Sequence, residues 1–141
     1  MLNTQEKYWG ETTCTALYFQ YFFCGNDKGI IRVFDLQNED RIKDLKPLKD
    51  KQLYGNPVRS LDISQNMEYL VAGYDSGTIA IFDLKSYKLV KVEKQLHDSM
   101  VLGVKIVTAV DNTITTISFE RDGAVSNSKF STKGLFNSTK M

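Results

Sequence analysis

An internal repeat of twelve residues restricts the fold of this chain more than any other feature. Residues 25–36 align with residues 73–84 at a constant offset of 48 positions, without insertion or deletion. Seven positions are identical, namely Gly25, Asp27, Gly29, Ile31, Phe34, Asp35 and Leu36 in the first copy and Gly73, Asp75, Gly77, Ile79, Phe82, Asp83 and Leu84 in the second. Chance does not place seven matches at fixed spacing, so the chain is predicted to have a repeat architecture.

Each copy of the repeat begins with a turn and continues as a strand. The Asp-x-Gly triplets at 27–29 and 75–77 predict tight hairpin turns, because aspartate can bond its own backbone and glycine accepts positive φ. In the strand that follows, Ile31 and Val33 point one way and Phe34 points the other way. A sheet with one face in water would carry polar residues on that face. Both faces of each sheet are therefore predicted to be covered.

The second copy lies inside a longer unit of four predicted strands, whose other strands cover residues 57–64, 69–73 and 89–92. The first unit begins the same way, with strands at 13–18 and 21–25. A shorter third unit is predicted from strands at 101–107 and 113–119 around an Asp111-Asn112 turn. It is shorter than the other two units and lacks a clean Gly-x-Asp-x-Gly pattern.

Four strands in a unit of about 45 residues are typical of a propeller blade. The predicted fold is all-β, a partial β-propeller of about three four-stranded antiparallel blades. The expected boundaries are an N-terminal extension at 1–12, a partial propeller at 13–136 (blades at about 13–50, 51–95 and 96–136) and a tail at 137–141. The stretch from Asp122 to Met141 is rich in Ser, Lys and Asn, so it is expected to be partly ordered at most.

Composition and charge exclude several classes of function. Eighteen basic and 17 acidic residues leave a net charge of +1, whereas nucleic-acid binders usually have a basic surplus. Cys14 and Cys24 are interpreted as small buried residues in a reducing compartment. With one histidine, they do not supply the four ligands of a structural zinc site. The N-terminus has no apolar core of a secretory signal, and we expect no metal and no cofactor.

No catalytic residues are predicted, so we expect no enzyme activity. His97-Asp98-Ser99 has the residue types of a hydrolase triad, but neighbours on one strand point to opposite faces and cannot form a relay. The aspartates of the two repeats lie in separate blades, which argues against shared acid-base chemistry. They are interpreted as turn and hydrogen-bonding residues.

The repeat resembles the WD-repeat family. Phe34-Asp35 and Phe82-Asp83 stand where the family signature has Trp-Asp, and Asp27 and Asp75 stand where its blades carry a turn aspartate. His97 stands near the family histidine that precedes the first strand of a blade. The predicted structural signature therefore comprises Asp27, Gly29, Phe34, Asp35, Asp75, Gly77, Phe82, Asp83 and His97.

A narrower resemblance involves residues 55–63, 70–77, 97–121 and 134–136. These segments are similar to the propeller family of the CORVET-complex tethering subunit, number eight of the vacuolar protein sorting set, and the likeness covers about residues 13–136. The third unit lacks residues between Val107 and Asp111 that this family usually has, which implies a missing or repaired strand. It implies a cytoplasmic protein-interaction scaffold, peripheral on endosomal membranes, that acts in endosome-to-vacuole or endosome-to-lysosome transport. The implied partners are other subunits of the tether and a Rab-type GTPase. A generic WD-repeat adaptor in another complex is the alternative.

Two further expectations concern closure and charge. Propellers close with about 4–8 blades, so three blades would leave an apolar face bare at each end of an open arc. The chain could be a piece of a longer gene product, complete a ring with another copy or another partial propeller, or form a marginal arc; we favour the first. Lys43, Lys46, Lys49, Asp50 and Lys51 are interpreted as a solvated loop between blades, with anionic lipid or an acidic partner as the alternative.

Overall fold

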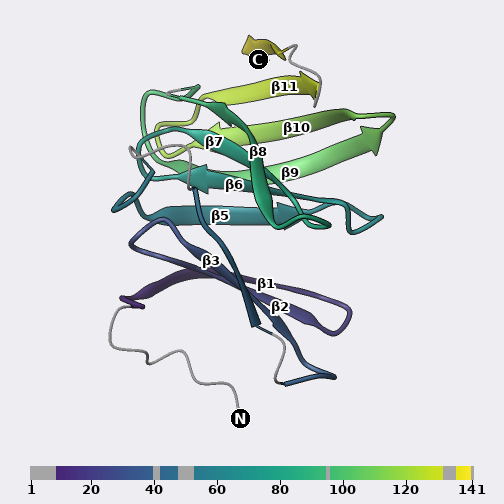
Figure 1. Ribbon diagram of the computed structural model, residues 1–141. Coiled ribbons are helices and arrows are strands. Elements are labelled where there is room, and N and C mark those ends of the chain that lie inside the picture. Colours follow the sequence, from purple (N-terminus) through teal and green to yellow (C-terminus); the bar gives the residue numbers. More distant parts are fainter. Residues whose placement is uncertain (1–8, 40–41, 48–52, 95, 132–135, 141) are drawn as a thin grey trace.

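The computed structural model describes residues 9–39, 42–47, 53–94, 96–131 and 136–140 (Figure 1). In these residues the chain forms three antiparallel sheets of four strands each, in which the strands are ordered as in the sequence. The first sheet contains β1 (Thr12–Tyr18), β2 (Tyr21–Asn26), β3 (Ile31–Asp35) and β4 (Ile42–Leu45). The second contains β5 (Val58–Ile63), β6 (Tyr69–Tyr74), β7 (Ile79–Asp83) and β8 (Lys88–Glu93). The prediction of three four-stranded blades is confirmed.

The third blade has all four strands: β9 (Val101–Val110), β10 (Thr113–Glu120), β11 (Val125–Ser131) and β12 (Phe136–Lys140). The predicted missing strand was therefore wrong, and the stretch from Asp122, expected to be partly ordered at most, contains β11 and β12. In β11, Ser126, Ser128 and Phe130 are buried whereas Asn127 and Lys129 are exposed. This alternation has the period of a strand. Composition alone did not indicate the strand, because two of its buried residues are serines.

The same hairpin turn joins the second and third strands of every blade. Gly29, Gly77 and Gly123 have φ values of 85°, 86° and 98°, a backbone conformation that glycine adopts without steric cost. Each N–H donates to the carbonyl three residues earlier. Arg121-Asp122-Gly123 is therefore the turn of the third blade, although arginine occupies the place of Asp27 and Asp75.

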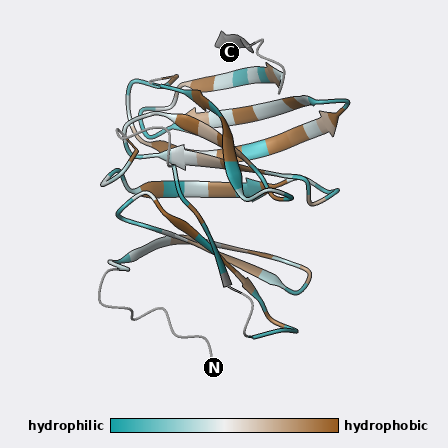
Figure 2. Cartoon of the chain, in the orientation of Figure 1, coloured by the Kyte–Doolittle hydropathy of each residue, from teal (hydrophilic) through white to brown (hydrophobic). Residues whose placement is uncertain are grey.

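The sheets pack face to face, with their first strands β1, β5 and β9 next to one another (Figure 1). One core lies between the first two blades and includes Phe23, Val58 and Phe82. A second core lies between the second and third blades and includes Ile81, Val101 and Phe130. Brown, apolar segments alternate with hydrophilic ones along the strands that form these cores (Figure 2). Phe34 and Phe82 are both 0% exposed, so the prediction that both faces are covered is confirmed for the first two sheets.

Candidate binding surfaces and the repeated blade signature

A glycine on the second strand of a blade makes room for the next blade. A Cβ atom added to Gly25 would lie 2.9 Å from the Val58 Cβ atom, and one added to Gly73 would lie 2.7 Å from the Val101 Cβ atom. Val58 and Val101 are the first residues of β5 and β9. One of the seven repeated positions, occupied by Gly25 in the first copy and Gly73 in the second, is therefore glycine because neighbouring blades approach closely there.

Side chains of each first strand also bond the next first strand. The Cys14 Sγ atom lies 3.6 Å from the Val58 carbonyl oxygen, which also accepts a hydrogen bond from the Thr13 hydroxyl. The Ser60 hydroxyl donates to the Val101 carbonyl oxygen at 3.2 Å. Cys14 and Ser60 are paired with Gly25 and Gly73 in their own sheets, so the two interfaces have the same construction.

In the third blade the glycine of this pair lies on the first strand instead of the second. Phe119 stands where the other blades have glycine, and its partner on β9 is Gly103. A Cβ atom on Gly103 would lie 2.1 Å from the Phe119 ring, so the ring lies over this glycine. On the same face Asn127 is exposed, whereas the equivalent Val33 and Ile81 are buried. This outer face is therefore mixed in polarity, with Phe119 41% exposed.

The outer face of the first blade is covered by a residue from the predicted N-terminal extension. Trp9 is 4% exposed and packs with Cys24 and Phe34. The Arg32 guanidinium lies 4.7 Å from the Trp9 ring centroid and bonds both carboxylate oxygens of Asp44, at 2.6 and 2.9 Å. The expectation of a bare apolar face was therefore wrong for the first blade, which Trp9 covers. The outer face of the third blade is open, but polar residues interrupt its apolar surface.

The aspartates of the Phe-Asp pairs hold the turn after the third strand. The Asp35 carboxylate accepts hydrogen bonds from two backbone N–H groups, those of residues 37 and 38, at 3.1 and 3.3 Å. The Asp83 carboxylate accepts the equivalent bonds from residues 85 and 86, at 2.7 and 3.3 Å. Both are turn bonds of the kind that aspartate side chains commonly make.

The aspartates of the Asp-x-Gly triplets bond elsewhere than expected. The Asp27 carboxylate accepts the Glu11 N–H at 3.1 Å, and the Asp75 carboxylate accepts Arg59 Nε at 3.0 Å. In the first blade the neighbouring Asn26 holds the turn, because its Oδ1 accepts the N–H groups of residues 28 and 30. These two aspartates thus tie the turn to the start of their own blade, and their expected self-bonding was wrong.

His97 lies in the loop before β9 and is fully buried. Its Nε2 atom is 2.7 Å from the Ser118 hydroxyl, and its Nδ1 atom is 3.7 Å from Glu120 Oε1. Glu120 Oε2 also accepts the backbone N–H and the hydroxyl of Ser99. Because His97, Asp98 and Ser99 lie in a loop, the prediction that strand alternation separates their side chains was wrong. The group nevertheless lies inside the blade, where its burial keeps substrate away, so its geometry fits a clamp on the start of the third blade.

The two cysteines are free thiols on opposite faces of the first sheet. Burial raises the pKa of both the Cys14 and the Cys24 thiol to about 11. Thiols with a raised pKa are poor nucleophiles and poor metal ligands at neutral pH, because the thiolate is the reactive form. No cluster of three metal-ligating side chains occurs in the described part of the chain.

The predicted lysine loop is in part a strand. Lys43 belongs to β4 and is exposed, and Lys46 follows the end of that strand. Lys49, Asp50 and Lys51 lie outside the described residues. Within the described ranges no helix is long and apolar enough to cross a membrane.

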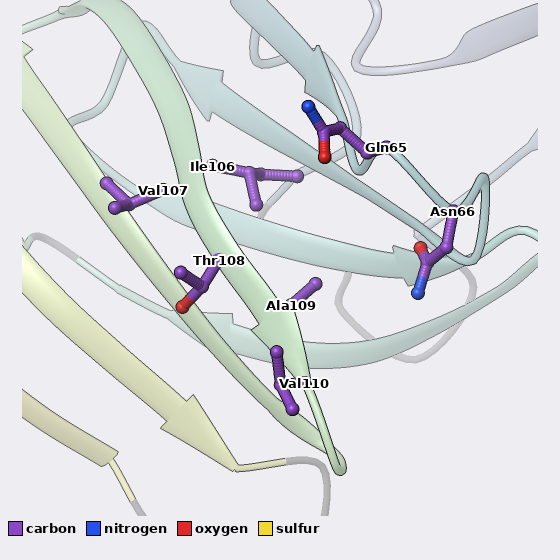
Figure 3. A pocket seen from close by; sticks show the side chains of 7 residues that line it. All are labelled: Gln65, Asn66, Ile106, Val107, Thr108, Ala109 and Val110. Atoms are coloured by element: carbon purple, nitrogen blue, oxygen red, sulfur yellow. The ribbon is translucent and has the colours of Figure 1, made fainter.

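A groove lies between the β5–β6 turn and the far end of β9 (Figure 3). It has a volume of about 320 Å³ and is lined by Gln65, Asn66 and residues 106–110, none of which is charged. Nothing in the sequence indicated this groove, because it depends on how far β9 extends past its neighbour.

Repeated four-stranded sheets, packed through their first strands, define an arc of WD-type propeller blades. The Cps50 (Swd1) β-propeller domain of Myceliophteria thermophila aligns with 100% of this chain and 41% of its own, at 14% identity and a TM-score of 0.76. The RRP9 WD40 repeats align with 96% of this chain and 40% of their own, at 16% identity and a TM-score of 0.70. The designed Ika4 protein aligns over 85% of this chain and 66% of its own, at 22% identity and a TM-score of 0.62. The chain thus spans about two fifths of the first two structures.

The sequence comparison identifies the particular propeller. The Vps8 β-propeller family matches residues 1–141, and the chain belongs to this family. No curated protein sequence matches the chain. Membership in this family, together with a WD-type fold, supports a protein-interaction scaffold.

Proposed function

We propose that this chain is a propeller portion of an endosomal vesicle-tethering subunit, acting without catalysis in transport from endosomes to the vacuole or lysosome. The observation that carries the proposal is the match of the Vps8 β-propeller family to residues 1–141. The scaffold has polar clusters that are buried and structural, such as His97 with Ser118 and Glu120. Its partners would be other subunits of the tether and a Rab-type GTPase, and it would lie peripherally on the cytoplasmic face of endosomes.

The blade arrangement supports the proposal that this arc works inside a larger ring. It spans about two fifths of the propellers of similar fold, and propellers close with about 4–8 blades. The outer face of the third blade still exposes Leu102 and Phe119 at 48% and 41%. A larger assembly, formed by further blades or by a partner, would bury these side chains.

The experiment is co-purification from cells of the tagged natural protein that contains this segment, with the recovered subunits identified by mass spectrometry. A Phe82→Ala variant removes a ring that is 0% exposed and disrupts the core between the first two blades. A Leu36→Ala variant at a 40% exposed turn residue is the matched control. We expect recovery of the other tether subunits and endosomal localisation with the wild type and the control, and loss of both with Phe82→Ala. Recovery of an unrelated complex would favour the generic adaptor and contradict the tethering role.

A further inference from the structure

The innermost strand of the third blade extends past the contacts that hold it. Side chains of β5 satisfy outward backbone groups of β9 at two points: the Ser60 hydroxyl donates to the Val101 carbonyl, and Asp62 Oδ2 accepts the Ile106 N–H at 2.7 Å. β5 ends at Ile63, whereas β9 continues to Val110. The last four residues of β9 therefore have β10 on one side and the groove on the other (Figure 3).

The hairpin geometry shows which backbone groups face this groove. Asp111 and Asn112 form the two-residue turn between β9 and β10, and their φ values of 50° and 65° fit a type I′ turn. The residues that flank such a turn, here Val110 and Thr113, form a hydrogen-bonded pair. Hydrogen-bonded and non-hydrogen-bonded pairs alternate along an antiparallel ladder. The N–H and C=O groups of Ala109, the next residue along β9, therefore point away from β10 and towards the groove.

The register supports this assignment independently. Residue 107 is skipped in the pairing of β9 with β10, which marks it as a bulge. The alternation of β10 across that bulge places Ile106 in the next outward position, and the Ile106 N–H is the group that bonds Asp62. For Ala109, by contrast, the described residues provide no hydrogen-bond partner on the groove side.

The groove wall defines the chemistry of an occupant. Val107 and Val110 are 54% and 61% exposed, and the carboxamides of Gln65 and Asn66 lie across from the strand (Figure 3). An uncharged wall disfavours ionised side chains, because they would lose hydration without gaining a partner. About 320 Å³ is at the lower end of the range for ligand pockets, roughly 300–1,000 Å³, so a short segment fits and a folded domain does not.

We propose that the free edge of β9 at Ala109 binds a short, extended, uncharged segment of a partner protein, which adds to the third blade as a further strand. Backbone groups would provide the affinity, and the exposed valines with the two carboxamides would select neutral side chains. An unpaired strand edge without charged residues is the kind of surface that pairs with another chain. The inference deepens the proposed scaffold function by naming one binding edge and the class of segment that it takes.

The test uses the ¹⁵N-labelled chain and a hexapeptide of alternating threonine and valine, acetylated and amidated so that it carries no charge. Chemical-shift mapping is expected to place the peptide at residues 106–110 and at the Gln65 and Asn66 side chains. A second peptide, N-methylated on every residue, lacks backbone donors along both of its edges. We expect the Ala109 amide to shift with the first peptide and the second peptide to bind more weakly.

Two variants separate backbone pairing from side-chain contact. Ala109→Pro removes the outward N–H without removing a bond to β10, whereas Ala109→Ser keeps that N–H. Loss of one backbone hydrogen bond should weaken binding by between about twofold and about tenfold, and Ala109→Ser should bind like the wild type. If Ala109→Pro does not fold, as judged by circular dichroism, the N-methylated peptide tests backbone pairing from the other side, because it removes the donors that would bond the Ala109 carbonyl.

Three results would overturn the inference: an unshifted Ala109 amide at millimolar peptide, equal binding of the N-methylated peptide, or shifts confined to the outer face at Leu102 and Phe119. The experiment uses the isolated chain and no tether subunit. Its failure would therefore leave the tethering proposal intact, and failure of co-purification would leave this edge to be judged by its own data.

Discussion

Replacing Gly73 with alanine should separate the second and third blades. The added Cβ atom would lie 2.5 Å from Val101 Cγ1 and 2.5 Å from Ser60 Oγ, whereas carbon atoms in contact are usually about 3.5–4.0 Å apart. The third blade must therefore move back by roughly 1 Å at this point or adopt strained side-chain conformations. Val101 is 0% exposed, so its packing leaves little room for such adjustment.

The magnitude follows from two opposing effects. Overpacking of a core typically costs about 1–3 kcal/mol, and replacing glycine stiffens the unfolded chain, which returns about 0.4–1 kcal/mol. We expect Gly73→Ala to lower the free energy of unfolding by about 1–2 kcal/mol. At roughly 4 °C per kcal/mol for a domain of this size, the melting temperature should fall by roughly 4–8 °C.

The assay is urea denaturation monitored by circular dichroism, with a double-mutant cycle as its control. Val101→Ala alone should cost about 2 kcal/mol, because it removes two buried methyl groups and leaves a cavity. In the double variant the new alanine occupies part of that cavity, so the combined loss should be smaller than the sum by roughly 1 kcal/mol. Additive losses, or a Gly73→Ala variant as stable as the wild type, would refute the proposed contact between the blades.

Three further predictions concern single side chains. Phe82→Ala should lower the free energy of unfolding by about 3–5 kcal/mol, because its ring is fully buried, whereas Phe119→Ala on the open face should cost under about 1 kcal/mol; equal losses in urea titrations would contradict the assignment of faces. Because Cys14 and Cys24 have folded-state pKa values of about 11, raised by burial from 9.0, their contribution to stability should be complete below pH 9 and be lost as pH rises towards 11. Native protein should also react with a thiol reagent at pH 8 much more slowly than unfolded protein, and equal rates would contradict their burial. His97→Ala should cost about 1–3 kcal/mol by leaving buried polar partners unsatisfied, measured by thermal melting; an unchanged melting temperature would argue against the clamp.

The repeat predicted two blades well because local chemistry determines their shape. Glycine at positive φ determines the turns at Gly29 and Gly77. Large apolar residues on both faces of one strand required cover on both sides, and Phe34 and Phe82 are indeed buried. These signals lie within a dozen residues, so the sequence alone contains them.

The third blade was harder to predict because its signals depend on tertiary contacts. The buried positions of β11 include Ser126 and Ser128, which composition assigns to a polar tail. The pairing of Phe119 with Gly103 becomes visible only when the two strands are aligned with each other. The cover that Trp9 provides for the first blade has no local signal, since it depends on where the N-terminal segment crosses the sheet.

The most direct test of the three-blade arrangement is an isotope-edited nuclear Overhauser experiment on protein with labelled valine methyl groups. The structure predicts contacts from the Val58 methyl groups to the Gly25 Hα atoms and from the Val101 methyl groups to the Gly73 Hα atoms, since both valines pack within van der Waals range of those glycines. Observation of both would establish the same blade-to-blade contact at two successive interfaces. Absence of either one in the folded chain would contradict the account of repeated, side-by-side propeller blades.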